Sequence, residues 1–120
     1  MLFAVLLYAN EAEHESRDAE TAARAGAAHI AFQGPLREKG ALGPGALLAG
    51  DKNAVHIRTR NGEEKVAQGP AVHLDESLHG VYLIEATSLE EAIAAARALP
   101  HDLVTVEIRP VVRMAPDPSF

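Results

Sequence analysis

The sequence predicts a single α+β domain, in which an antiparallel sheet carries helices on one face. Three observations lead to this fold class. The chain begins with a short apolar run, its second half contains a strand-helix-strand pattern, and an Asn-Gly pair between them marks a hairpin. Its length of 120 residues suits one domain with a core of its own.

The first strand is expected over Leu2–Ala9, which is apolar at both alternating sets of positions and therefore suits a sheet covered on both sides. One long helix is expected over residues 11–39. Its apolar stripe consists of Ala22, Ala25, His29, Phe32 and Leu36. Pro35 lacks an amide proton and collides with the preceding turn, so we expect a kink there or a restart of the helix.

Residues 41–49 contain Gly43-Pro44-Gly45 and are expected to form a bent or bulged strand towards an edge of the sheet. Residues 54–60 and 63–67 flank Asn61-Gly62, which supplies the two positive φ angles of a type I′ turn. We expect this hairpin to have one wet side, because apolar and charged side chains alternate along its first strand.

Residues 79–86 form the next expected strand, and Ser88 with Glu91 has the spacing of a capping box that starts a helix. Apolar residues recur at helical spacing as far as Leu99, and Pro100 stops the helix. Residues 104–109 alternate as a last strand. The domain is expected to cover residues 1–114 and to be followed by a loose tail, residues 115–120.

This order of elements is the ferredoxin-like plan with an inserted β-hairpin. Both helices then lie on one face of the sheet, although its strands are apolar on both sides. A second copy of the chain is the natural cover for the other face, so we expect a homodimer whose two sheets form a barrel.

Composition excludes several functions. The chain has no cysteine, so disulfides and cysteine nucleophiles are absent. Its net charge of −6 and few aromatic residues argue against nucleic acid or an anionic membrane as partner. The first apolar run is too short to span a bilayer and has no signal-peptide pattern, so we expect a cytoplasmic protein.

The run Gln68-Gly-Pro-Ala71, followed after a polar connector by His79-Gly-Val-Tyr-Leu-Ile-Glu85, resembles the motif of the YCII-related family, also called DGPF-domain proteins. The resemblance implies a dimeric α/β barrel and a cavity near the dimer interface, where a helix histidine and an aspartate are an acid/base pair. His29 matches the histidine, and Gly69 and Pro70 match the motif. Gln68 replaces the aspartate, and an amide cannot take up a proton at neutral pH as a carboxylate can.

His29 is ionisable within an apolar helical stripe, which suits either a proton-transferring group or a core histidine held by one hydrogen bond. Tyr82 lies on a strand and is either a ligand contact or a core residue with a satisfied hydroxyl. Four possible metal ligands stand close together in the sequence, and an exposed polar connector explains them equally well; they are His73, Asp75, Glu76 and His79. We expect no metal and no cofactor.

The resulting hypothesis is a small-molecule pocket near the dimer interface. His29 would be catalytic, with Gln68, Gly69, Pro70 and Tyr82 as ligand-binding residues, in lyase- or isomerase-type acid/base chemistry. The alternative is a non-enzymatic ligand-binding or dimerisation module that has lost catalysis.

Overall fold

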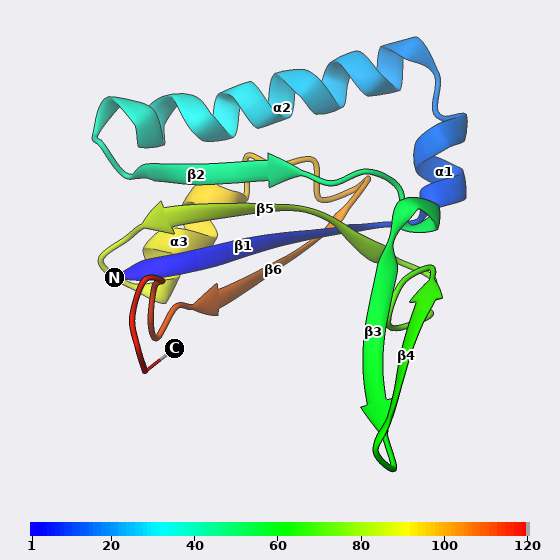
Figure 1. The fold of residues 1–120 in the computed structure, drawn as a ribbon. Helices are drawn as coiled ribbons and strands as arrows, with labels where there is room; N and C mark the ends of the chain where they lie inside the picture. Colours follow the sequence, from blue (N-terminus) through cyan, green and yellow to red (C-terminus); the bar gives the residue numbers. More distant parts are fainter. Residues whose placement is uncertain (120) are drawn as a thin grey trace.

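A computed structural model describes residues 1–119. It contains six strands, three α-helices and one short 3-10 turn, and its N-terminus lies where the first strand begins (Figure 1). In chain order the elements are β1 (Leu2–Ala9), α1 (Glu11–Ser16), α2 (Ala19–Glu38), β2 (Leu42–Leu47), η1 (Asp51–Asn53), β3 (Val55–Arg60), β4 (Glu63–Gln68), β5 (Ser77–Glu85), α3 (Leu89–Ala96) and β6 (Thr105–Pro110).

Four strands form an antiparallel sheet in the order β2-β5-β1-β6, and β3 pairs with β4 in a separate two-stranded sheet. The mixed α+β fold with an antiparallel sheet is therefore confirmed. With the hairpin set aside, the chain runs β-α-β-β-α-β, the element order of the ferredoxin-like plan. The strand β2 lies at an edge and its register shifts between Leu42 and Gly45, which confirms the expected bulged edge strand.

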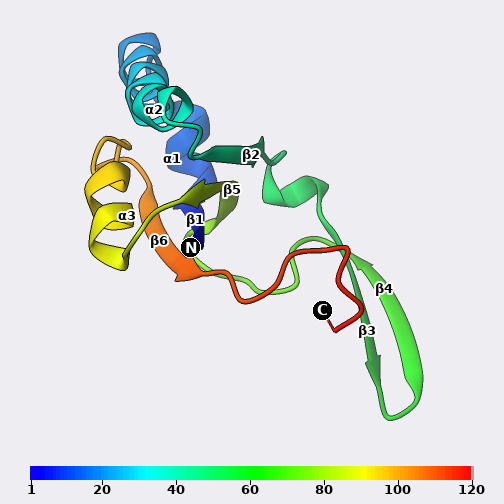
Figure 2. The same cartoon turned by 90° about the vertical axis from the view of Figure 1, so that its left-hand side faces the viewer.

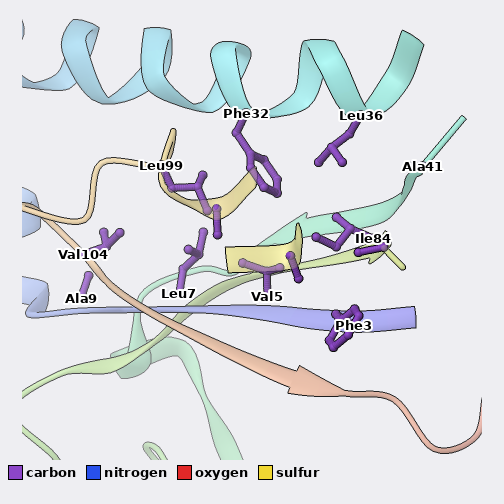
Figure 3. Packing of buried hydrophobic residues seen from close by; sticks show 13 residues of the cluster. Phe3, Val5, Leu7, Ala9, Phe32, Leu36, Ala41, Ile84, Leu99 and Val104 are labelled. Carbon is purple, nitrogen blue, oxygen red and sulfur yellow. The ribbon is translucent and has the colours of Figure 1, made fainter. Parts of the chain in front are cut away.

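The core lies between the sheet and the two helices α2 and α3 (Figure 3). The odd-numbered residues of β1 point into it, because successive side chains of a strand face opposite sides. Phe32 and Leu36 reach it from α2, and Ala92 and Ala96 from α3. Each large apolar side chain buried here stabilises the fold by about 1.5–3 kcal/mol. The even-numbered residues of β1 face the side without helices and are only half-buried.

The single long helix expected over residues 11–39 is wrong, since α1 ends at Ser16 and α2 begins at Ala19. Asp18 explains the break: its carboxylate accepts a hydrogen bond from the amide of Thr21 at 2.8 Å and so caps a new helix. A restart at Pro35 is also wrong, because α2 continues to Glu38. Pro35 has no amide proton, so the carbonyl of Ala31 has no helical hydrogen-bond donor. Ala31 is exposed, and its carbonyl can bind water instead.

The turn between β3 and β4 has φ of 53° at Asn61 and 77° at Gly62, so the expected two-residue turn with positive φ at both positions is confirmed. The hairpin extends away from the four-stranded sheet (Figure 2). The expectation of one wet side is wrong for the single chain: Val55 is 59% and Ile57 66% exposed, so the apolar side is also open to water.

Helix α3 begins with a variant of the expected capping box. The Ser88 hydroxyl accepts from the amide of Glu91 at 3.1 Å, and the Glu91 carboxylate accepts from the amide of Thr87, one residue before the cap. The helix ends at Ala96 instead of continuing to Leu99, which lies in the following turn and is 2% exposed. None of the described helices is long and apolar enough to cross a membrane. Phe120, the last residue of the expected tail, lies outside the described residues.

Candidate functional site

A cavity of about 480 Å³ lies between α2 and the β2-β5 edge of the sheet. Three polar side chains line it, His29, Gln33 and Tyr82, and the remaining lining is apolar or glycine. Among the described residues that line the cavity, none carries a fixed charge at neutral pH. Its size lies within the range of small-molecule pockets, which are typically mostly apolar with a few polar groups.

The secondary structure explains how these three residues meet. His29 and Gln33 are four residues apart on α2, which places them one turn apart on the same face of the helix. Tyr82 is opposite Val5 in the sheet and therefore points to the face that the helices cover. Its ring packs against Phe32 with a centroid distance of 4.8 Å. The Tyr82 hydroxyl lies 2.8 Å from Nδ1 of His29 and 2.8 Å from Nε2 of Gln33.

His29 is half-buried, and its surroundings favour the neutral imidazole. Burial, and after it the positive charge of Arg17, lowers the pKa of His29 below the ordinary value of 6.5. No carboxylate is hydrogen-bonded to His29 in the part of the chain that the structure describes. The carboxylate of Asp51 accepts a hydrogen bond from the Ser77 hydroxyl at 2.7 Å. The immediate partner of the imidazole is thus a phenol.

The glycine at position 45 allows the edge strand to pass close to Tyr82. A Cβ atom at Gly45 would lie 2.8 Å from Cδ1 and 3.2 Å from Cε1 of the tyrosine ring, closer than ordinary contact. By contrast, a Cβ at Gly26, which also lines the cavity, would meet nothing within 4 Å. The edge strand therefore passes close to the tyrosine ring at Gly45, whereas a side chain at Gly26 would enter open space.

The structure places Gln68, Gly69 and Pro70 apart from this cavity within one chain. Gln68 is the exposed last residue of β4 and pairs with Val55. The φ of Gly69 is 100°, its amide donates to Ala54 at 2.7 Å, and its carbonyl accepts from Nδ1 of His56 at 2.9 Å. These contacts close the base of the hairpin. Pro70 lines a second cavity of about 630 Å³, together with the η1 region and the connector that precedes β5.

The possible metal ligands of the connector are also dispersed. Asp75 accepts from Asn10 through its backbone carbonyl, the Glu76 carboxylate accepts from the Thr105 hydroxyl, and the His79 ring meets His14 at a centroid distance of 4.3 Å. Within residues 1–119, no three His, Asp or Glu side chains gather closely enough to hold a metal ion.

Of the residues expected in the site, the structure therefore brings together His29 and Tyr82. Gln33 was missed by the sequence reasoning, although its spacing of one helical turn from His29 was a usable signal. Hydroxyl, imidazole and amide can each donate and accept hydrogen bonds, and the imidazole can also transfer a proton. The arrangement is therefore suited to orienting a ligand oxygen and to exchanging a proton with it through His29.

Comparisons with known proteins agree with this fold. The family model of the YCII-related domain matches residues 1–115. An uncharacterized protein of Rhizobium meliloti strain 1021, R00369, is 35% identical over 119 residues, which are 97% of this chain and 96% of the relative. A similar solved structure is a 5-chloro-2-hydroxyhydroquinone dehydrochlorinase from Burkholderia phenoliruptrix AC1100 in complex with 2,5-dihydroxybenzoquinone. Its TM-score is 0.55 at 17% identity, covering 95% of this chain and 96% of that one, so the likeness concerns the fold.

Proposed function

The chain belongs to the YCII-related family, as its motif resemblance predicted, and we propose that it binds a small molecule in the cavity beside His29 and exchanges a proton with it through this imidazole. One observation carries the proposal: His29, the one imidazole among the described residues that line the cavity, is half-buried and is joined to the Tyr82 hydroxyl at 2.8 Å. A buried imidazole that stays neutral near pH 7 can pass a proton in either direction.

The reaction class proposed is of the lyase or isomerase type. The structural neighbour is a dehydrochlorinase bound to a small ring compound, and a ring of that size suits a cavity of about 480 Å³. The uncharged lining favours a neutral ligand, because a charged one would lose its hydration without gaining an opposite charge. His29 and Tyr82 are the proposed contact residues, while Gln68, Gly69 and Pro70 contribute to the second cavity and the hairpin base.

The cavity can be closed without disturbing its walls. In Gly26→Leu the new side chain extends into open space and fills the cavity, whereas Gly34→Leu adds the same side chain to α2 at a position that does not line it. A panel of small neutral ring compounds is screened by thermal shift. Compounds that stabilise the wild type and Gly34→Leu but not Gly26→Leu support the pocket. Equal stabilisation of all three proteins contradicts it.

The non-enzymatic alternative has an observation in its favour, since Gln68 replaces the motif acid and no carboxylate is hydrogen-bonded to His29 among the described residues. His29→Gln separates the two functions. If a ligand still binds this variant but only the wild type converts it, as followed by mass spectrometry, the result supports the enzyme. Unaltered binding with no conversion by either protein supports a binding module.

We also infer that a second copy covers the open face of the sheet and completes a dimeric barrel. Ala4 and Leu6 of β1 and their neighbours Leu83 and Val81 of β5 form an apolar band there, and all four are only half-buried in the single chain. Light scattering after gel filtration tests this. We expect the wild type to be a dimer and Leu6→Arg to be a monomer. The control Ile30→Arg, at an exposed site on α2, is expected to remain a dimer. A monomeric wild type contradicts the inference.

A further inference from the structure

Four side chains from α2 and β5 form a directed chain of hydrogen bonds that ends at His29. Nη2 of Arg37 lies 3.3 Å from Oε1 of Gln33, whose Nε2 lies 2.8 Å from the Tyr82 hydroxyl, and this in turn lies 2.8 Å from Nδ1 of His29. A guanidinium can only donate hydrogen bonds. The atom of Gln33 that faces Arg37 is therefore the oxygen, and the amide nitrogen faces the phenol.

The same reasoning determines the direction in which the Tyr82 hydroxyl proton points. The Gln33 amide donates to the Tyr82 oxygen, which leaves the single hydroxyl proton for a different acceptor. Nδ1 of His29 is its partner among the described hydrogen bonds. If Nδ1 instead carried the proton and donated to the phenol, the hydroxyl proton would have no acceptor in the described residues, at a cost for a half-buried group. Nδ1 is thus the unprotonated nitrogen of the neutral ring.

We propose that Gln33 is a positioning residue that directs the Tyr82 hydroxyl proton to Nδ1 of His29, so that Nε2 carries the ring proton and offers it to the oxygen of a bound ligand. The ligand class follows, and this part rests on the proposed function: a small neutral molecule with a carbonyl or comparable acceptor oxygen. In this tautomer His29 meets the ligand oxygen as a hydrogen-bond donor.

The tautomer is measured without any ligand. Two-bond ¹H–¹⁵N correlation spectra, recorded at a pH where histidines are neutral, distinguish the protonated from the unprotonated ring nitrogen. The wild type is expected to show the Nε2–H form. In Gln33→Glu the carboxylate accepts the hydroxyl proton, so the phenol oxygen must accept from Nδ1–H and the tautomer reverses. Ala31→Glu places the same charge on an exposed position of α2 and is expected to match the wild type.

An Nδ1–H form in the wild type, or a Gln33→Glu spectrum that keeps the wild-type tautomer, would overturn the proposal. If Gln33→Glu does not fold, Gln33→Met removes the amide donor without adding charge. Its His29 is expected to populate both tautomers, and an unchanged Nε2–H form contradicts the role of Gln33.

The ligand class is tested with a matched pair of probes, acetophenone and α-methylstyrene, which differ by a carbonyl oxygen in place of a methylene group. Acetophenone is expected to bind the wild type about tenfold more tightly, and Gln33→Glu is expected to lose this preference. Equal binding of both probes to the wild type refutes the donor role. If neither probe binds, the ligand class and the pocket of the proposed function are both refuted. The tautomer measurement separately decides the role of Gln33.

Discussion

Gly45→Ala tests whether the edge strand holds Tyr82 in its hydrogen-bonding position. The added Cβ would lie 2.8 Å from Cδ1 of the ring, whereas ordinary van der Waals contact begins at 3.4 Å. The ring or the strand must yield by about 0.6 Å, which stretches the two 2.8 Å contacts of the hydroxyl to the limit of hydrogen bonding. Overpacking and two weakened hydrogen bonds together lower the free energy of unfolding by about 2–4 kcal/mol.

Urea denaturation measures this cost, and the ring resonances of His29 report whether its partner has moved. Gly43→Ala is the matched control on β2: its Cβ would also lie 2.8 Å from a neighbour, the carbonyl oxygen of Leu83, so it is expected to destabilise without shifting the His29 resonances. The reasoning is refuted if Gly45→Ala leaves those resonances unchanged. It is also refuted if the variant costs as much in a Tyr82→Ala background as in the wild type, because the clash would then not involve the ring.

Three further predictions concern stability. Burial, and then the charge of Arg17, lowers the pKa of His29 in the folded protein. Between this lowered pKa and the ordinary value of 6.5, the unfolded chain therefore binds more protons than the folded one. The contribution of the neutral His29 to the free energy of unfolding is full above pH 6.5 and is lost as the pH falls through the lower folded pKa. Urea titrations from about pH 8 to about pH 5 should show a smaller loss for His29→Gln, and equal losses contradict this. Phe32→Ala, at a site 2% exposed, is expected to cost about 3–5 kcal/mol by urea denaturation, and a cost below about 1 kcal/mol contradicts the core assignment. Ser88→Ala removes the N-cap of α3 and should cost about 1 kcal/mol, whereas Ser16→Ala, an exposed site with one weak contact, should stay within about 0.5 kcal/mol; similar costs contradict the capping role.

Features that depend on neighbouring residues were predicted well. The bounds of β1, the turn at Asn61-Gly62 and the start of α3 all follow from side-chain alternation, positive φ or a cap within a few residues. The missed break before α2 belongs to the same class. Asp18 stands three residues before Thr21 and is a normal N-cap, but the apolar stripe suggested a continuous helix.

The site was predicted only in part. His29 was recognised because it is an ionisable residue in an apolar stripe, yet its partner Tyr82 is 53 residues away in the sequence. Gln68 was expected near both residues, but it lies in the hairpin, where it pairs with Val55.

The sequence by itself determined the fold class, the family and most element boundaries, because periodicity, turn chemistry and capping act over a few residues. Only the tertiary structure decided which polar side chains meet: the strand order β2-β5-β1-β6 places Tyr82 under α2 and beside Gly45. The physical reason is that a hydrogen bond needs a donor and an acceptor within about 3 Å, and the packing of a helix against a sheet, not the spacing along the chain, sets that distance.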